Sequence, residues 1–115
     1  MQPETAGLLW DAHEATRLIA EFVSDKSWTD YATDAMLRSA VERQFQIIGE
    51  ALNRISRLDP ATAKRIPDLP RIVAFRNVLV HGYAMIDDEI VWEVANTRAV
   101  DLAQELGALL SESRD

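Results

Sequence analysis

The chain has 115 residues, enough for one domain with a single modest hydrophobic core. It contains no cysteine, which excludes disulfides, thiolate metal sites and a cysteine nucleophile. Hydrophobic residues make up 48% of the chain, but no apolar run approaches the roughly 18 residues of a membrane helix. The N-terminal residues do not resemble a signal peptide. We therefore expect one soluble, cytoplasmic domain over residues 1–115, with no membrane partner.

The net charge of −7 argues at first against a polyanionic partner, because phosphate binding normally requires basic surface. The charge is unevenly distributed, however. Residues 38–76 contain eight basic and four acidic side chains, whereas the rest of the chain contains four basic and fifteen acidic ones. Charges on helix exteriors are often merely solvated, so the asymmetry permits a nucleic-acid partner without requiring one.

Apolar residues at helical spacing predict two long helices in the first half of the chain. The first covers about residues 4–25, and Ser27 or Thr29 is available to cap the next. The second is expected to run without a break over residues 30–58. The first stripe consists of Leu8, Ala12, Ala15, Ile19 and Phe22, and the second of Leu37, Val41, Ile48, Leu52 and Ile55, broadened by Met36, Ala40, Ile47, Ala51 and Leu58.

The second half predicts two more main helices. Asp59 and Pro60 are typical of the cap and first residue of a helix, and they predict a short extra helix. Residues 68–70 have the same pattern and predict the start of the next main helix. This helix is expected over residues 70–81, with Gly82 as its terminator. Acidic residues 87–89 favour the start of a last helix that continues towards the C-terminus, and the tail 111–115 should fray. The fold expected is an all-α antiparallel bundle of four main helices plus a short extra helix.

Residues 76–83 gather groups that could carry chemistry at the end of an apolar helix: Arg76, Asn77, His81 and Tyr83. On an ideal helix Asn77 and His81, four residues apart, share a face. Arg76 and His81 are five apart, about 140° around the axis. They converge on one point only if the helix end loosens at Gly82, or if a second chain completes the site. The spacing therefore favours a dimer.

These groups suit phosphodiester cleavage without a metal. The His81 imidazole can take a proton from a ribose 2′-OH near neutral pH and return one to the leaving oxygen. The Arg76 guanidinium keeps its charge and can stabilise the phosphorane, while Asn77 would hold a phosphate oxygen or orient the imidazole. With two histidines and no cysteine, we expect no transition-metal site and no cofactor. The structural alternative is that Arg76 pairs with Glu50 and His81 caps its helix.

The same residues resemble a known family. Arg76, four intervening residues and His81 match the Arg-x4-6-His signature of HEPN domains, and the continuation to Gly82 and Tyr83 is similar to its HepT-like form. Three further stretches agree with that family: residues 48–51 (Ile-Gly-Glu-Ala), residues 66–75, and the acidic turn and tryptophan of residues 87–92. The resemblance covers roughly residues 30–103.

The resemblance implies a helical bundle that dimerises through its motif helix, cleaves RNA, and acts as the toxin of a toxin–antitoxin pair. It implies a minimal nucleotidyltransferase antitoxin that transfers AMP to the tyrosine at the position of Tyr83. It also implies a supporting role for Glu50 in orienting Arg76. If the helices that contain residues 38–43 and 76–81 pack together, Arg38 and Arg43 would contact RNA phosphates.

Two other functions fit the same residues. One is a non-catalytic module that binds a nucleotide or a nucleotidyltransferase through Arg76 and His81. The other is a plain dimerisation bundle, in which both side chains would be paired or capping and remote from any cleft. The joint presence of Arg, Asn, His and Tyr favours the nuclease, since a scaffold does not need all four together.

Overall fold

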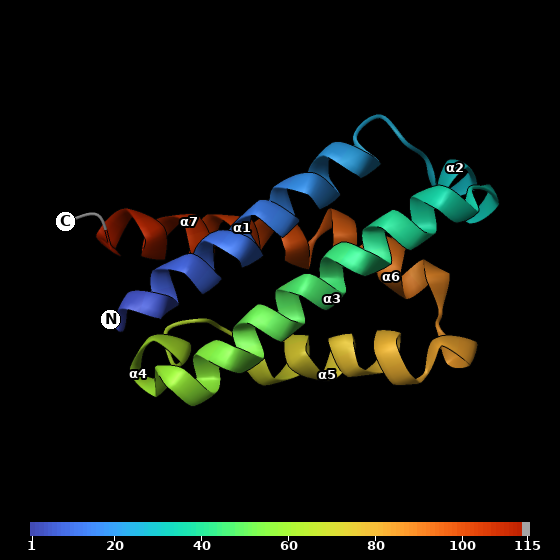
Figure 1. Ribbon diagram of the computed structural model, residues 1–115. Coiled ribbons are helices and arrows are strands. Elements are labelled where there is room, and N and C mark those ends of the chain that lie inside the picture. Colours follow the sequence, from blue (N-terminus) through green and yellow to red (C-terminus); the bar gives the residue numbers. More distant parts are fainter. Residues whose placement is uncertain (114–115) are drawn as a thin grey trace.

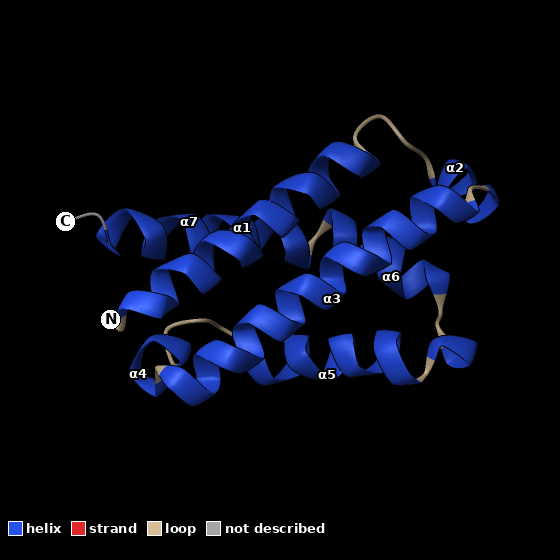
Figure 2. Ribbon diagram, viewed as in Figure 1, coloured by secondary structure: helices blue, strands red, loops and turns tan. Residues whose placement is uncertain are grey.

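Every regular element in the described part of the chain is a helix, as Figure 2 shows, so the all-α prediction is confirmed. The computed structural model describes residues 1–113 and, for Tyr83, the backbone alone. The elements in chain order are α1 (Pro3–Val23), α2 (Trp28–Thr33), α3 (Ala35–Leu58), α4 (Pro60–Ala63), α5 (Leu69–His81), the 3-10 turn η1 (Tyr83–Met85), α6 (Asp88–Asn96) and α7 (Arg98–Ser113).

Helix α3 lies between α1 and α5 and shares an interface with each (Figure 1). Helix α1 packs against α3 and, on another side, against α7, whereas α5 has its extensive helix contacts with α3 alone. The predicted stripe of α3 is buried as expected at four of its five positions, Val41, Ile48, Leu52 and Ile55. Full burial of such side chains contributes roughly 1.5–3 kcal/mol each. Met36 does not join the stripe, because it is 84% exposed.

The prediction of one unbroken helix over residues 30–58 is wrong, because the chain bends at Asp34. This residue has an extended backbone (φ −118°, ψ 98°), and its carboxylate accepts the N–H of Leu37 at 3.1 Å. Asp34 thereby caps α3, and the preceding turn becomes the separate helix α2. The expected cap at Ser27 is confirmed: its hydroxyl accepts the N–H of Asp30 at 3.1 Å, and the Asp30 carboxylate accepts the N–H of Ser27 at 2.8 Å.

The last predicted helix is also divided, at Thr97. The Thr97 hydroxyl donates to the carbonyl of Glu93 at 2.7 Å, and the Asn96 amide donates to the carbonyl of Trp92 at 2.8 Å. Side chains that bond back onto the preceding turn compete with the helix for its carbonyls and favour a bend. The apolar period passes through the bend unchanged, so periodicity alone predicted one helix.

Three ends of helices differ from expectation. Helix α1 ends at Val23, before Asp25 takes a left-handed backbone conformation (φ 62°). Asp68 precedes α5 as predicted, but it is also left-handed (φ 59°) and its carboxylate makes no cap hydrogen bond. At the other end of the chain, residues 111–113 are helical where fraying was expected, and residues 114 and 115 lie outside the described part.

The buried carboxylate of Asp59 joins the N-terminus to the α3–α4 turn. It accepts hydrogen bonds from the backbone N–H of Gln2 (3.0 Å) and from the hydroxyls of Thr5 (3.0 Å) and Thr62 (2.9 Å). It also caps α4 by accepting the N–H of Thr62 at 3.2 Å, as the Asp59–Pro60 pattern predicts. These donors, the Gln2 N–H first, lower the pKa of Asp59 from 3.8 to about 2.

None of the described helices combines the length and apolar character that crossing a bilayer would require.

We expect the stability of the protein to fall as the pH is lowered from about 4 to about 2. The pKa of Asp59 is lower in the folded chain (about 2) than its ordinary value of 3.8, so the unfolded state binds a proton first and is favoured in acid. Asp59→Asn should lower the melting temperature at pH 7 and flatten its dependence on pH below 4. Thermal unfolding followed by circular dichroism at a series of pH values measures both.

The matched control is Asp101→Asn, which removes an exposed carboxylate from α7. It should leave the pH dependence as in the wild type. An Asp59→Asn variant with the wild-type acid transition would show that Asp59 does not govern it.

Candidate active site

Helix α5 carries the motif and is held against α3 by its apolar side. Leu69 and Leu79 are buried, and the rings of Phe45 and Phe75 pack edge to face with centroids 5.2 Å apart. The helix ends at His81, where the N–H of Gly82 donates to the carbonyl of Val78 at 2.8 Å. Termination at Gly82 was predicted, and it occurs without a left-handed backbone (φ −117°).

The stem of Arg76 crosses α3 at Gly49. A Cβ atom at position 49 would overlap the Cβ and Cγ atoms of Arg76, so only glycine permits the observed approach. The sequence contained Gly49 within the Ile-Gly-Glu-Ala segment, but periodicity gave no reason for a glycine in mid-helix. The reason is steric: the backbone of α3 forms the surface on which the arginine lies.

The guanidinium of Arg76 uses only part of its hydrogen-bonding capacity. Its Nη1 donates to the side-chain oxygen of Asn77 at 3.0 Å. Its Nε is buried and has no hydrogen-bond partner among the described residues. A buried charged donor without an acceptor is costly, and in native proteins such atoms often mark a functional position. The hydrogen-bonding capacity of Arg76 is therefore not consumed by the fold.

Asn77 and His81 lie exposed on the last turns of α5. The side chain of His81 makes no hydrogen bond or ion pair with any described residue, and the end of the helix is closed by the Gly82 backbone instead. Asn77 contacts Arg76 rather than His81. The imidazole is thus available to a substrate, while water must be excluded by the substrate or by another chain.

Glu50 does not meet Arg76 in this chain. It is exposed and lines a surface hollow between α1 and α3, together with Arg54, and no ion pair joins it to Arg76 in residues 1–113. Consecutive helical residues point about 100° apart, so α3 turns Gly49 towards α5 and Glu50 away from it. An orienting role for Glu50 finds no contact within the described chain.

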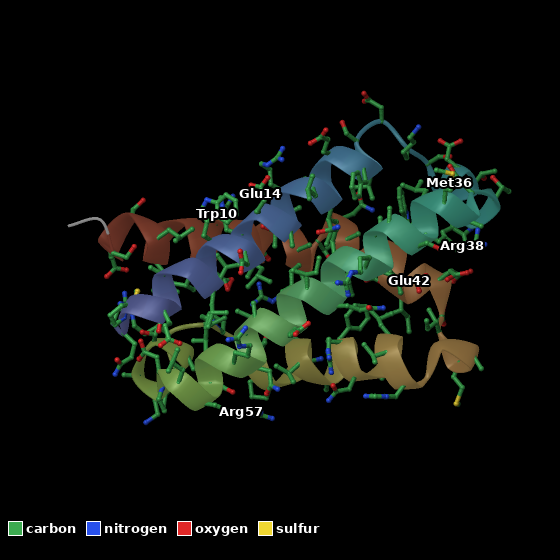
Figure 3. The ribbon with its side chains drawn as sticks, in the orientation of Figure 1. Trp10, Glu14, Met36, Arg38, Glu42 and Arg57 are labelled. Carbon is green, nitrogen blue, oxygen red and sulfur yellow. The ribbon has the colours of Figure 1, made fainter. Side chains whose placement is uncertain are left out.

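Arg38 is a structural residue, a role that sequence reasoning missed. Its Nη1 donates to the carbonyls of Ala32 (2.6 Å) and Tyr31 (3.3 Å), and its Nε lies 3.7 Å from the carboxylate of Asp88 (Figure 3). It therefore ties the end of α2 to the start of α6. Burial, and to a lesser extent Asp88, raises the pKa of the neighbouring Glu42 carboxyl despite the charge of Arg38. The only available signal was the capping residue at Asp34, four positions earlier.

Arg43 differs from Arg38, because it is exposed and its one side-chain hydrogen bond to described residues goes to the side-chain oxygen of Gln46, at 3.4 Å. It can reach a phosphate without breaking a structural bond. The backbone of Tyr83 begins η1, two residues after His81, and its side chain lies outside the described part of the structure. No group of three or more metal-ligating side chains occurs within residues 1–113.

Comparison with known proteins decides the family. A sequence model described as ribonuclease HepT-like matches residues 12–109, most of the chain. The chain belongs to the HepT-like family. A protein of Methanocaldococcus jannaschii, named provisionally as an RNase, is 28% identical over 105 residues, which cover 90% of this chain and 94% of that protein. The probable ribonuclease HepT of Thermococcus cleftensis is 34% identical over 88 residues, covering 74% of this chain and 76% of that one. No solved structure matches the chain.

Membership of the HepT-like family agrees with the resemblance seen in the Arg76 to Tyr83 motif. The structure adds that the motif arginine of this HepT-like chain depends on the adjoining helix: Arg76 can lie where it does only because residue 49 has no side chain.

We expect Gly49→Ala to destabilise the protein by about 1–3 kcal/mol, the usual cost of overpacking a tight contact. The added methyl group would push the Arg76 stem, and α5 with it, away from α3. In an Arg76→Gly background, which removes the overlapping atoms, the same substitution should cost much less. Chemical denaturation of the four proteins of this double-mutant cycle measures the coupling.

Gly7→Ala is the matched control, because a Cβ atom there would meet nothing within 4 Å. On the exposed side of α1 it should stabilise the protein by about 0.5–1 kcal/mol, as alanine does in a helix. An equal cost of Gly49→Ala with and without the Arg76 side chain would show that another neighbour is responsible.

Proposed function

We propose that this HepT-like chain is an endoribonuclease that cleaves RNA without a metal ion, with His81 as general acid and base and Arg76 as the stabiliser of the transition state. The main support for the proposal is the arrangement of side chains at the end of α5. The stem of Arg76 packs against Gly49, and its guanidinium donates a hydrogen bond to Asn77. His81, one helical turn beyond Asn77, is exposed and forms no side-chain hydrogen bond with the described residues. Two of its relatives carry the provisional names of an RNase and of a ribonuclease HepT, and these names support the same class of reaction.

The reaction requires no group beyond the side chains of this protein and its substrate. His81 takes the proton of the ribose 2′-OH, and the resulting oxygen attacks the adjacent phosphorus. The Arg76 guanidinium balances the charge that develops on the phosphorane, with Asn77 holding it in place. A proton returns to the leaving 5′-oxygen, the P–O5′ bond breaks, and a 2′,3′-cyclic phosphate remains. Arg43, exposed on α3, is our candidate for a phosphate contact outside the reacting group.

We further propose that two copies associate through α5. This helix has its extensive packing on α3 only, and it exposes Val78 between Asn77 and His81, with half of that side chain accessible. Nearby apolar side chains are also accessible: Met85 is 84% exposed and Ile90 is 51% exposed. Arg76 and His81 are five residues apart and do not share a face of α5, so one helix alone does not bring them together. A twofold contact between two α5 helices would bring the His81 of one copy towards the Arg76 of the other.

Regulation by a partner is the remaining part of the proposal. We propose that the chain is the cytoplasmic toxin of a toxin–antitoxin pair and that a minimal nucleotidyltransferase neutralises it by transferring AMP to Tyr83. That residue follows His81 by two positions, so a bulky anionic adduct there would repel RNA phosphate from the site.

Purified wild-type protein in excess EDTA should cleave RNA and leave 2′,3′-cyclic phosphate ends. His81→Ala and Arg76→Ala should each reduce the rate by at least about 100-fold, the lower range for loss of acid–base help or of a charge stabiliser. Cleavage of labelled tRNA and mRNA, with analysis of the new ends, measures this.

Preincubation with the nucleotidyltransferase and ATP should abolish cleavage by the wild type but not by Tyr83→Phe.

The matched control is His13→Ala, which removes the other histidine of the chain, located on α1. It should cleave at the wild-type rate. Equal cleavage by wild type and His81→Ala would point to a contaminating nuclease. Absence of cleavage by both, on all RNAs tried, would favour the non-catalytic module that binds a nucleotide or a nucleotidyltransferase.

Val78→Glu should convert the protein from a dimer to a monomer and reduce RNA cleavage at least tenfold, because it places a charge in the apolar contact between two α5 helices. Light scattering coupled to size exclusion measures the mass. Val100→Glu, on α7, introduces the same charge at a similarly exposed valine (46%) and should remain dimeric and active. A wild-type protein that is active as a monomer would contradict the shared site.

A further inference from the structure

A second surface feature lies between α1 and α3, and none of its lining residues comes from α5. We call it the Trp10 groove; it is lined by α1 side chains from Leu8 to Leu18 and α3 side chains from Gln44 to Arg54, and its hollow measures about 430 Å³. A neighbouring hollow of about 430 Å³ shares Leu8, Trp10, Asp11 and Arg54 with it. Trp10 therefore stands between two adjoining depressions.

Trp10 is 54% exposed, which is unusual for the largest apolar side chain in a chain with a well-formed core (Figure 3). The floor beneath it is apolar, since Leu8, Ala15 and Ala51 are buried and Ile47 is half-buried. An accessible tryptophan beside an apolar floor is the composition of an interface hot spot, where aromatic anchors contribute most of the binding energy.

The rim of the Trp10 groove is acidic. Asp11, Glu14 and Glu50 line it together with one cation, Arg54. Glu4 lines the neighbouring hollow and also a third one, which it shares with Arg54 and Arg57. Arg17 pairs with Glu14 at 2.6 Å but is not part of the lining. The remaining carboxylates form no ion pair within residues 1–113, so the rim has an excess of negative charge that the chain itself does not neutralise.

We propose that the Trp10 groove binds a basic amphipathic helix of a partner protein. A trough between two packed helices accepts a third helix, whose apolar residues at positions i, i+3 and i+7 would lie on the floor. Its lysines and arginines would meet the rim carboxylates and stack on Trp10, a favourable cation–π arrangement.

Other occupants fit less well. RNA would bring phosphates against the carboxylates of the rim. A second copy joined by twofold symmetry would place one acidic groove against the other. In the dimer proposed above, α5 forms the contact and the Trp10 groove stays open, so the inference does not depend on RNA cleavage.

A fluorescent helical peptide of about 18 residues, with leucines on one face and lysines and arginines beside them, is a direct probe. We expect it to bind the full chain at least tenfold more tightly than the same peptide with glutamates in place of its basic residues. Trp10→Ala should weaken binding at least tenfold, as loss of a hot-spot anchor does. Glu4→Gln/Asp11→Asn should weaken it and reduce its dependence on salt. Fluorescence anisotropy measures each affinity.

The charge-matched control is Glu93→Gln/Asp101→Asn, which removes two exposed carboxylates from α6 and α7 and should leave peptide affinity within about twofold of the wild type. Melting temperatures verify folding, and if Trp10→Ala fails to fold, the exposed Glu4 and Asp11 pair decides. Equal affinity of all the variants would overturn the proposal. So would a Trp10→Ala variant that loses RNA binding or dimerisation instead, since RNA or a second copy would then be the occupant.

Discussion

The close approach of α3 and α5 at Gly49 is the constraint on which the candidate site depends. Where the two helices cross, Arg76 lies directly on the α3 backbone, and no side chain larger than hydrogen fits between them. The approach fixes the start of a long, flexible arginine side chain, which otherwise loses much conformational freedom when it is held in one place. It also sets α5 at the edge of the molecule, in extensive contact with α3 alone, so that the opposite side of the motif helix remains accessible.

This arrangement explains why the candidate site in one chain has polar groups without hydrogen-bond partners. Arg76 has a buried Nε without an acceptor among the described residues, its Nη1 donates to Asn77, and the His81 side chain makes no hydrogen bond or ion pair with them. A catalytic centre usually holds its groups through additional hydrogen bonds in a place from which water is excluded. In this protein, a site from which water is excluded would have to form between α5 and a substrate or second chain packed against it. The exposed Val78 has the apolar character that such a contact needs.

Sequence reasoning predicted the helical class, the buried stripes of α1 and α3, and the motif at the end of α5, because these depend on local period and on short-range spacing. It missed the breaks at Asp34 and Thr97, since each arises from side chains that bond to the nearby backbone while the apolar period continues. It did not predict the structural contacts of Arg38, whose guanidinium lies where three helices meet. Such contacts join α2, α3 and α6, and no pattern in one segment contains them.

The roles of the charged side chains also depend on contacts between helices, which local sequence patterns do not contain. The basic excess between residues 38 and 76 permitted a nucleic-acid partner without requiring one, and in the structure those side chains make different contacts. Arg38 holds helices together, Arg76 belongs to the motif, and Arg54 lies among the carboxylates of the Trp10 groove. Only part of the local charge is therefore free of contacts within the fold, in a protein whose net charge is −7. The carboxylates that line the Trp10 groove would repel phosphates and so limit the orientations in which RNA can approach.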